Sequence, residues 1–300
     1  MNFQNAFLFF HFGKIPTYLV YAIEHARIFN PDSEIILIVD SIKETSMVDR
    51  FNVKIHDIKE FNSQMLQDFR RSYRHISSYN EKYEKFCFER WFVSEIIRRS
   101  SPKKTYVIVD SDVAIFGDVS NIIQSIPNCP ISLSGCSPHF SFIRGSMDGF
   151  LNYILEFYSD SEKIENAERR HLANLNTIDA CNLTDNSFLP SFMQISSDVQ
   201  NYDIFSTNGF MDTNIHVPQG FDYIQLRRRP RKKVFWKIEE ERVIPYLKRG
   251  DELVKAFILH FQGPGKRVFH RFNSIDGPTS PLQVWWWNQI FQKRWLANLM

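Results

Sequence analysis

Residues 106–116 read YVIVDSDVAIF, in which two apolar runs enclose the acidic pair Asp110 and Asp112. The first run is typical of a strand that is buried on both faces, so the acidic pair follows the carboxyl end of that strand. In extended backbone, side chains two residues apart project to the same side, which lets the two carboxylates converge on one cation. Ligands of open α/β sheets bind beyond the carboxyl ends of the strands. The stretch therefore predicts an α/β fold with a cation site at the edge of its sheet.

The residues before this stretch alternate between strand and helix patterns. Strand-like apolar runs lie at 6–10, 35–39 and 53–58, and helical patterns lie at 17–29 and 60–99. Strands that alternate with helices in this way build parallel sheets. We expect an open, mainly parallel, twisted sheet flanked by helices.

The rest of the chain shows weaker patterns of the same kinds. They predict strands at 131–133, 223–226, 234–238 and 257–259, and helix over 146–176. No linker, internal repeat or low-complexity tract divides the chain. We expect one domain over 1–280, built from halves at 1–130 and 131–280, and an aromatic C-terminal helix at 281–300.

The composition is that of an ordinary globular protein, with 43% apolar and 23% charged residues among 300. A net charge of +2 gives no overall attraction for nucleic acid, so no nucleic-acid partner is predicted. Four cysteines without a C-x-x-C pair indicate reduced thiols, with a Cys129–Cys136 disulfide as a minor alternative. The first residues lack the pattern of a signal peptide, and no apolar stretch is long enough to span a bilayer. We expect a cytoplasmic protein that rests at most on the inner face of the membrane.

A second candidate element, HFQGPGK at residues 260–266, follows the last apolar run. An imidazole at a strand end, here His260, can complete a mixed set of metal ligands with carboxylates. Gly263 and Gly265 leave room for an anion to approach the backbone, and Lys266 brings a positive charge. The glycine spacing is not that of a P-loop, and Arg267 stands where Ser or Thr is required. A lone histidine is more often structural, but the combination with Gly-x-Gly-Lys favours a ligand.

The two elements together resemble the GT-A glycosyltransferases, most closely the family 8 branch that includes glycogenin and galactosyltransferase-like enzymes. The resemblance implies that Asp110, Asp112 and His260 bind Mn²⁺ or Mg²⁺ and that Lys266 contacts the diphosphate of a nucleotide-sugar donor. It covers the chain to about residue 120 and residues 257–266. On this resemblance, 1–130 is the nucleotide-sugar-binding half and 131–280 the acceptor half.

Two further residues are candidates for binding the donor. Arg90 falls on an apparently apolar helix face with Phe86, Val93 and Ile97, where an unpaired guanidinium would be costly. It needs either an internal carboxylate or a bound phosphate or sugar, and the resemblance implies the second. Asp40, at another strand end, can accept hydrogen bonds from a base or ribose or can cap its own loop. Ser111, inside the acidic motif, completes the predicted donor-binding set.

The middle of the chain offers candidates for the sugar and acceptor. Asp185 follows Thr184 in the first turn of a predicted helix. It is either a helix cap or a catalytic carboxylate that bonds sugar hydroxyls or acts as base for the acceptor hydroxyl. His139 and Asp212 are weaker candidates for lining the same cleft.

Two segments outside these motifs predict either surface structure or membrane contact. The run Arg227–Lys233 holds six positive charges in seven residues, as a solvated loop or as a surface for an acidic membrane. The tail Trp285–Trp295 carries an apolar stripe that packs on the domain or lies at a membrane interface. The membrane alternative includes a lipid-linked acceptor.

The sequence as a whole predicts a metal-dependent hexosyltransferase. It would move a sugar from a nucleotide-diphosphate sugar, by resemblance a UDP-sugar, to a hydroxyl acceptor in polysaccharide, lipopolysaccharide or other glycan synthesis. One alternative is a haloacid-dehalogenase-type phosphatase with Asp110 as nucleophile, although Ala114 stands where such enzymes have Thr or Val. The other is a nucleotide-sugar-binding protein without turnover.

Overall fold

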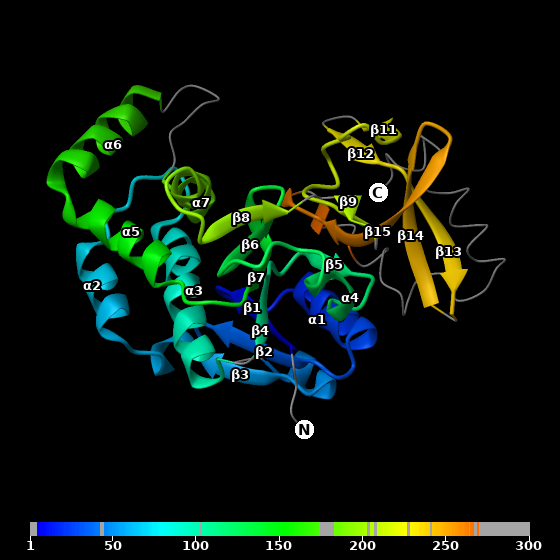
Figure 1. Ribbon diagram of the computed structural model, residues 1–300, viewed down its shortest axis with the longest axis horizontal. Coiled ribbons are helices and arrows are strands. Elements are labelled where there is room, and N and C mark those ends of the chain that lie inside the picture. Colours follow the sequence, from blue (N-terminus) through cyan, green and yellow to red (C-terminus); the bar gives the residue numbers. More distant parts are fainter. Residues whose placement is uncertain are drawn as a thin grey trace.

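The computed structural model describes residues 5–42, 45–102, 104–174, 183–202, 205–206, 209–226, 229–240, 242–263, 265–266 and 269 (Figure 1). The predicted tail Trp285–Trp295 and the helix at 281–300 lie outside these residues.

The larger of two main sheets has seven strands in the order β3-β2-β1-β4-β7-β6-β8. The pairs β1–β2, β1–β4, β2–β3 and β6–β8 are parallel, whereas β7 runs antiparallel to β4 and β6. The expected α/β fold with a mainly parallel sheet is therefore confirmed. The strands are β1 Asn5–His11, β2 Glu34–Val39, β3 Lys54–Asp57, β4 Thr105–Val109, β6 Ile131–Ser134, β7 Ser137–Ile143 and β8 Val199–Tyr202.

Helices cover both faces of this sheet. Along β1, Leu8 and Phe10 pack in a core with helices α2, α3, α5 and α7, while Phe7 and Phe9 pack in a second core with α1. This alternation follows from the two-residue period of a strand. The helices are α1 Thr17–Phe29, α2 Gln64–Ser72, α3 Glu81–Ser100, α4 Ser120–Ile123, α5 Asp148–Ser159, α6 Ser161–Asn174 and α7 Asp185–Met193, with 3₁₀ turns at Ser46–Phe51 and Ile58–Glu60.

A second sheet lies beside the first, at the right of Figure 1. Its order is β13-β14-β15-β10-β9, and β5 pairs with the other side of β15. Apolar side chains of this sheet join the core that also contains α1, so one hydrophobic core links the two sheets. The strands are β5 Val113–Ile115, β9 Phe205–Ser206, β10 Gly209–Met211, β13 Val234–Glu239, β14 Arg242–Arg249 and β15 Glu252–His260, and β11 Tyr223–Gln225 pairs separately with β12 Pro230–Lys232.

Several predicted elements need correction. The helix predicted at 60–99 is two helices, because Ser63 caps the start of α2 and Asn80 caps the start of α3 with a loop between them. The helix predicted at 146–176 is also two, since the Asp160 side chain accepts hydrogen bonds at the start of α6. The strands that were not predicted are β7, β8, β9, β10, β12 and β14. The division at residue 130 stays a prediction, and β6, β7 and β8 lie in the same sheet as β1–β4.

The remaining sequence features are partly placed. Cys129 and Cys136 are free thiols, so the alternative disulfide between them does not form. Within the described part of the chain, no helix combines the length and apolar character needed to cross a bilayer. The basic run is not a uniformly solvated surface, because Arg231 and Lys232 are buried and Lys232 pairs with Asp212 at 2.7 Å.

Candidate active site

The acidic pair lies in a tight turn between β4 and β5. The Val113 amide donates to the Asp110 carbonyl at 3.1 Å, and the Asp110 amide donates to the His139 carbonyl at 2.9 Å. The carboxylates therefore converge because the chain turns, not because it is extended as the sequence pattern suggested. The predicted convergence itself is found.

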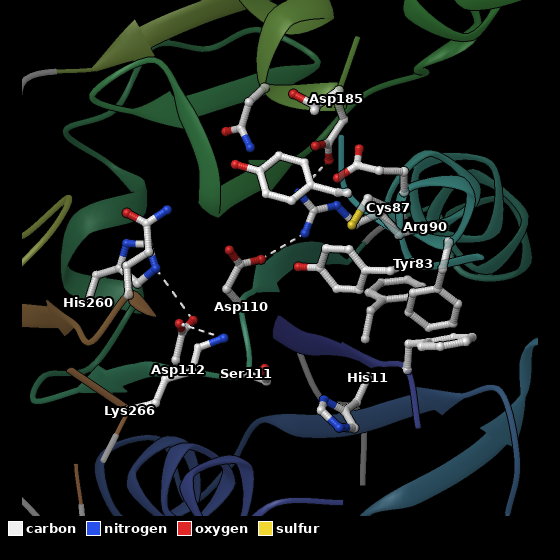
Figure 2. Close-up of a pocket in the computed structure, with 18 of the residues that line it drawn as sticks. His11, Tyr83, Cys87, Arg90, Asp110, Ser111, Asp112, Asp185, His260 and Lys266 are labelled. Atoms are coloured by element: carbon white, nitrogen blue, oxygen red, sulfur yellow. Dashed lines mark hydrogen bonds and ion pairs between the residues drawn. The ribbon is translucent and has the colours of Figure 1, made fainter. Parts of the chain in front are cut away.

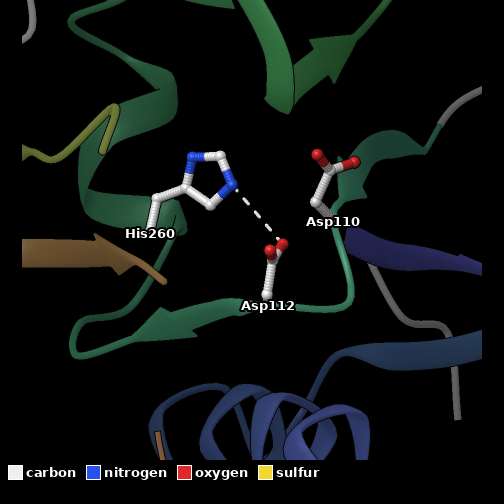
Figure 3. A group of neighbouring side chains, drawn as sticks. All are labelled: Asp110, Asp112 and His260. Carbon is white, nitrogen blue, oxygen red and sulfur yellow. Dashed lines mark ion pairs between the residues drawn. The ribbon is translucent and has the colours of Figure 1, made fainter. Parts of the chain in front are cut away.

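The register of two strands brings His260 beside this turn. His260, the last residue of β15, is the partner of Val113 in β5, and the Phe261 amide donates to the Asp112 carbonyl at 2.9 Å. As a result His260 Nε2 lies 3.4 Å from Asp112 Oδ1 (Figure 3). Lys266 Nζ lies 3.2 Å from the other carboxylate oxygen, Oδ2.

Asp110, Asp112 and His260 fit a divalent cation. Each offers one ligand atom, and these three atoms lie within 4.8 Å of one another. The Thr213 carbonyl is 2.6 Å from His260 Nδ1 and must accept its proton, which leaves Nε2 directed at Asp112. Two carboxylates and an imidazole oriented in this way suit Mn²⁺ or Mg²⁺.

The charges at this end of the site are balanced by exchangeable partners. Burial would raise the pKa of Asp112, but His260 and Lys266 lower it below its usual range. Burial would lower the pKa of His260, but Asp112 raises it to about 9. A divalent cation would take over the role of the imidazolium proton, because metal binding displaces protons from its ligands.

Arg90 connects the acidic turn to the start of α7. Its Nη1 donates to Asp110 at 2.7 Å and its Nη2 donates to Asp185 at 2.5 Å (Figure 2). Although burial lowers the pKa of Arg90, the two carboxylates raise it above its usual range, so the guanidinium stays charged. The internal-carboxylate interpretation of Arg90 is thus found in this structure.

Asp185 is not a helix cap, which was one of the two roles that the sequence allowed for it. It is the first residue of α7, and its Oδ2 accepts from Arg90 and, at 3.1 Å, from Trp91 Nε1. Burial raises the pKa of Asp185 against the opposing effects of Arg90 and Trp91.

The candidate cation site forms one end of a cavity of about 500 Å³, and Asp185 with its partner Arg90 forms the other end. Of the predicted residues, it brings together Arg90, Asp110, Ser111, Asp112, Asp185, His260 and Lys266 (Figure 2). The complete lining is Phe10, His11, Phe12, Tyr18, Tyr79, Tyr83, Glu84, Phe86, Cys87, Arg90, Asp110, Ser111, Asp112, Thr184, Asp185, Asn186, His260, Gln262 and Lys266. A neighbouring cavity of about 730 Å³ shares Tyr18 and Lys266 and is also lined by Lys14, Ile15, Pro16, Thr17, Tyr21 and Met47.

Three predicted polar residues lie outside the lining of this cavity. Asp40 accepts from the Gly13 amide at 2.7 Å and so stabilises its own loop. Asp212, fully buried, accepts from the His260 amide at 3.0 Å and pairs with Lys232, which fixes the end of β15. His139 stacks on His260 with ring planes 2° apart and centroids at 4.6 Å. Asp212 and His139 therefore hold His260 in position and are not part of the cavity lining.

The two predicted glycines also lie outside the cavity lining. Gly265 packs closely instead, since a Cβ there would lie 3.2 Å from Ile215. Gly263 has a φ of 61°, a conformation that glycine adopts readily. Of the residues that follow β15, Gln262 and Lys266 line the cavity.

Sequence reasoning missed several lining residues. His11 ends β1 and could have been found by the strand-end rule that found Asp110. On α3, Glu84 is three residues before Cys87 and Cys87 is three residues before Arg90, so each of these pairs is adjacent on the helix surface. Tyr18 and Tyr83 carry no local signal of this kind.

No protein-family model matches the chain, and no curated protein sequence matches it. Among solved structures, it is similar to mouse xyloside xylosyltransferase 1, at 9% identity and a TM-score of 0.43 over 66% of this chain and 84% of that one. It is similar to a glycosyltransferase involved in glycosylation of the major capsid of PBCV-1, at 13% identity and a TM-score of 0.40 over 89% and 98% of the two chains. It is also similar to the galactosyltransferase LgtC in complex with donor and acceptor sugar analogs, at 12% identity and a TM-score of 0.45 over 88% and 94%.

These three structures are glycosyltransferases, the class that the sequence motifs resemble. Likeness of this degree concerns the fold alone, and the case for a function rests on the side chains of the site.

Proposed function

We propose that this protein is a metal-dependent glycosyltransferase that moves a sugar from a nucleotide-diphosphate sugar to a hydroxyl acceptor. The observation that carries the proposal is the convergence of Asp110, Asp112 and His260 within 4.8 Å on the wall of a cavity that also holds Lys266. A cation site beside a lysine and at the edge of a mainly parallel sheet suits a diphosphate.

Each residue at the cation end has a task in this proposal. Asp110, Asp112 and His260 would hold Mn²⁺ or Mg²⁺, which when bound stabilises negative charge on the departing diphosphate. Lys266 would turn from Asp112 to a phosphate oxygen, which its partly exposed side chain has room to do. Arg90, fixed by two carboxylates, keeps Asp110 oriented toward the cation site.

In this proposal the donor extends across the two adjoining cavities. The neighbouring cavity, lined by Tyr18 and Tyr21, would take the nucleoside, which we take to be uridine from the motif resemblance. The sugar would then extend past the cation site toward Asp185. Both hydrogen bonds to Asp185 end on Oδ2, and we assign Oδ1 to a hydroxyl of the donor or acceptor.

The acceptor is proposed to be a glycan or lipid-linked hydroxyl. The burial of Arg231 and Lys232 removes two charges from the basic run that would have faced a membrane. Peripheral contact through the rest of that run and the aromatic tail stays a prediction, as does a location at the inner membrane face.

The phosphatase alternative fits the site less well. Its nucleophile, Asp110, has its Oδ1 occupied by Arg90, and its neighbour Asp112 is paired with His260 and Lys266. A binding protein without turnover would share the same residues and differs only in its reaction.

A thermal-shift screen of UDP and GDP with and without Mn²⁺ tests the proposal, followed by measurement of nucleoside diphosphate released from UDP-glucose, UDP-galactose and GDP-mannose. We expect a metal-dependent stabilisation in the wild type that Asp112→Ala abolishes and the exposed control Asp49→Ala retains. No metal-dependent stabilisation by any nucleotide would refute the proposal. Stabilisation without release in the presence of simple sugar acceptors would favour the binding protein, and inhibition by a fluoride-type phosphoryl mimic would favour the phosphatase.

A further inference from the structure

Glu84 is a buried carboxylate on the wall of the main cavity that the proposed mechanism does not use. It lies on α3, six residues before Arg90, and is only 3% exposed. It lines the same cavity as the cation site and Asp185. A ligand in that cavity therefore has this carboxylate within reach.

One oxygen of this carboxylate has no protein partner. Among the described residues, none forms a hydrogen bond with Glu84 Oε2, although the atom is shielded from solvent. Buried polar atoms are nearly always hydrogen-bonded, and those without a protein partner commonly belong to sites that receive a ligand or water. A hydroxyl group suits this carboxyl, because it can donate to the ionised form and accept from the protonated form.

The surrounding charges restrict what that donor is. Arg90, the guanidinium that acts on Glu84, is already shared between Asp110 and Asp185. Burial, reinforced by Asp185, raises the pKa of Glu84 to about 7 although Arg90 opposes the rise. The charge of Arg90 is already offset by Asp110 and Asp185, so this part of the cavity favours a neutral ligand such as a sugar hydroxyl over an anionic one.

We propose that Glu84 binds a hydroxyl group of the transferred sugar and makes the site selective for neutral sugars over those that carry a carboxylate. This assignment rests on the proposed function, because it needs a sugar attached to a diphosphate at the cation site. Arg90 links Asp110 at that site to Asp185, and both Arg90 and Asp185 act on the charge of Glu84, so Glu84 lies at the end of the cavity toward which the sugar is proposed to extend. Glu84 is thus a residue that determines specificity, distinct from the residues that hold the diphosphate.

Calorimetric titration of the wild type and of Glu84→Gln tests this assignment. The probes are UDP, GDP, UDP-glucose, UDP-galactose, GDP-mannose and UDP-glucuronate, each with Mn²⁺. We expect Glu84→Gln to weaken the preferred neutral nucleotide-sugar about tenfold while the free nucleoside diphosphate stays within about twofold. The same variant should narrow the difference between UDP-glucuronate and UDP-glucose, because the repelling charge is gone.

Glu81→Gln is the matched control, since it makes the same change at an exposed position of the same helix. A merely structural role for Glu84 would move the binding of nucleoside diphosphate and of nucleotide-sugar equally, and would overturn the assignment. Unchanged donor binding with slower transfer would also overturn it, by placing Glu84 at the acceptor. If no nucleoside diphosphate binds the wild type with Mn²⁺, both the proposed function and this assignment are wrong.

Discussion

The two ends of the main cavity each contain a buried aspartate, and the pKa values of the two shift in opposite directions. Asp112 is 4% exposed and Asp185 is 2% exposed. His260 and Lys266 lower the pKa of Asp112 despite burial, whereas burial raises the pKa of Asp185 despite Arg90 and Trp91. Two similarly buried carboxylates therefore differ in the direction of their pKa shifts, because their hydrogen-bond and charge partners differ.

The nature of the partners explains what each end can do. An imidazolium can lose its proton and a lysine can turn away, so the partners of Asp112 can yield to a cation and a phosphate. A guanidinium keeps its proton and an indole is held by packing, so the partners of Asp185 stay in place. The end with Asp112 can therefore exchange its partners for ligands, whereas the end with Asp185 keeps its partners in place.

The fixed end should show the largest effect on stability. Arg90→Met leaves Asp185 buried without its guanidinium, and we expect the free energy of unfolding to fall by about 3–5 kcal/mol. Urea unfolding at neutral pH measures this change. Adding Asp185→Asn to the variant should recover much of the loss, and a single variant as stable as the wild type would contradict the description of a fixed end.

The exchangeable end should show its effect in cation binding. Asp112→Asn removes a ligand, and we expect the affinity for Mn²⁺ alone to fall about a hundredfold or more. Titration of free Mn²⁺ followed by electron paramagnetic resonance measures it, with Asp49→Asn as the control. Equal affinities in the wild type and Asp112→Asn would show that these residues do not form a cation site.

Lys266 should have a smaller effect that separates phosphate from cation. Its side chain is 35% exposed, so solvent and salt screen its charge. We expect Lys266→Met to weaken UDP or GDP binding about tenfold at low salt and to leave Mn²⁺ affinity unchanged. The conservative variant Lys266→Arg should retain most of the binding; a loss of Mn²⁺ affinity instead would make Lys266 part of the cation site.

Glu84 should give the smallest effect, and its sign follows from its pKa. The pKa of about 7 in the folded protein lies above the ordinary value of 4.5, so the folded state holds its proton more tightly than the unfolded state. This contribution to stability is fully present below pH 4.5 and is lost as the pH rises through 7. Glu84→Gln keeps a neutral side chain, so it should be more stable than the wild type near pH 8 and should match it near pH 4.5.

Melting curves of the two proteins at both pH values check this trend, with Glu81→Gln as the reference. A constant difference across the pH range would show that the Glu84 carboxyl titrates normally.

The sequence predicted the cation end of the site, and at the other end it pointed to Arg90 and Asp185 but not to their pairing. Asp110 follows β4 and His260 ends β15, so both were found as polar residues at the ends of apolar strands, although the two strands lie in different sheets. The predicted reason for the convergence of Asp110 and Asp112 was wrong, because the pair sits in a turn and not in extended backbone. His260 lies beside the pair because β15 pairs with β5 next to that turn.

The other end depends on contacts between elements that have no fixed relation in sequence. Arg90 was recognised as needing an anion, but its partner Asp185 belongs to α7, whose docking against α3 no local pattern reveals. Glu84 looks like an ordinary charged residue in a helix with alternating charges. In the fold, β7 was missed because its serines interrupt the apolar pattern, although all but the first of its residues are buried.

The pairing of β15 with β5 also has a consequence for how the protein is made. The acidic turn leaves the ribosome early, and β15 is the last strand of the described chain. His260 reaches Asp112 only when β15 takes its place, so a nascent chain lacks one of the three proposed cation ligands until β15 has been synthesised. Cation binding would then report that β15 is paired with β5, and an enzyme of the proposed kind would be inactive until that pairing forms.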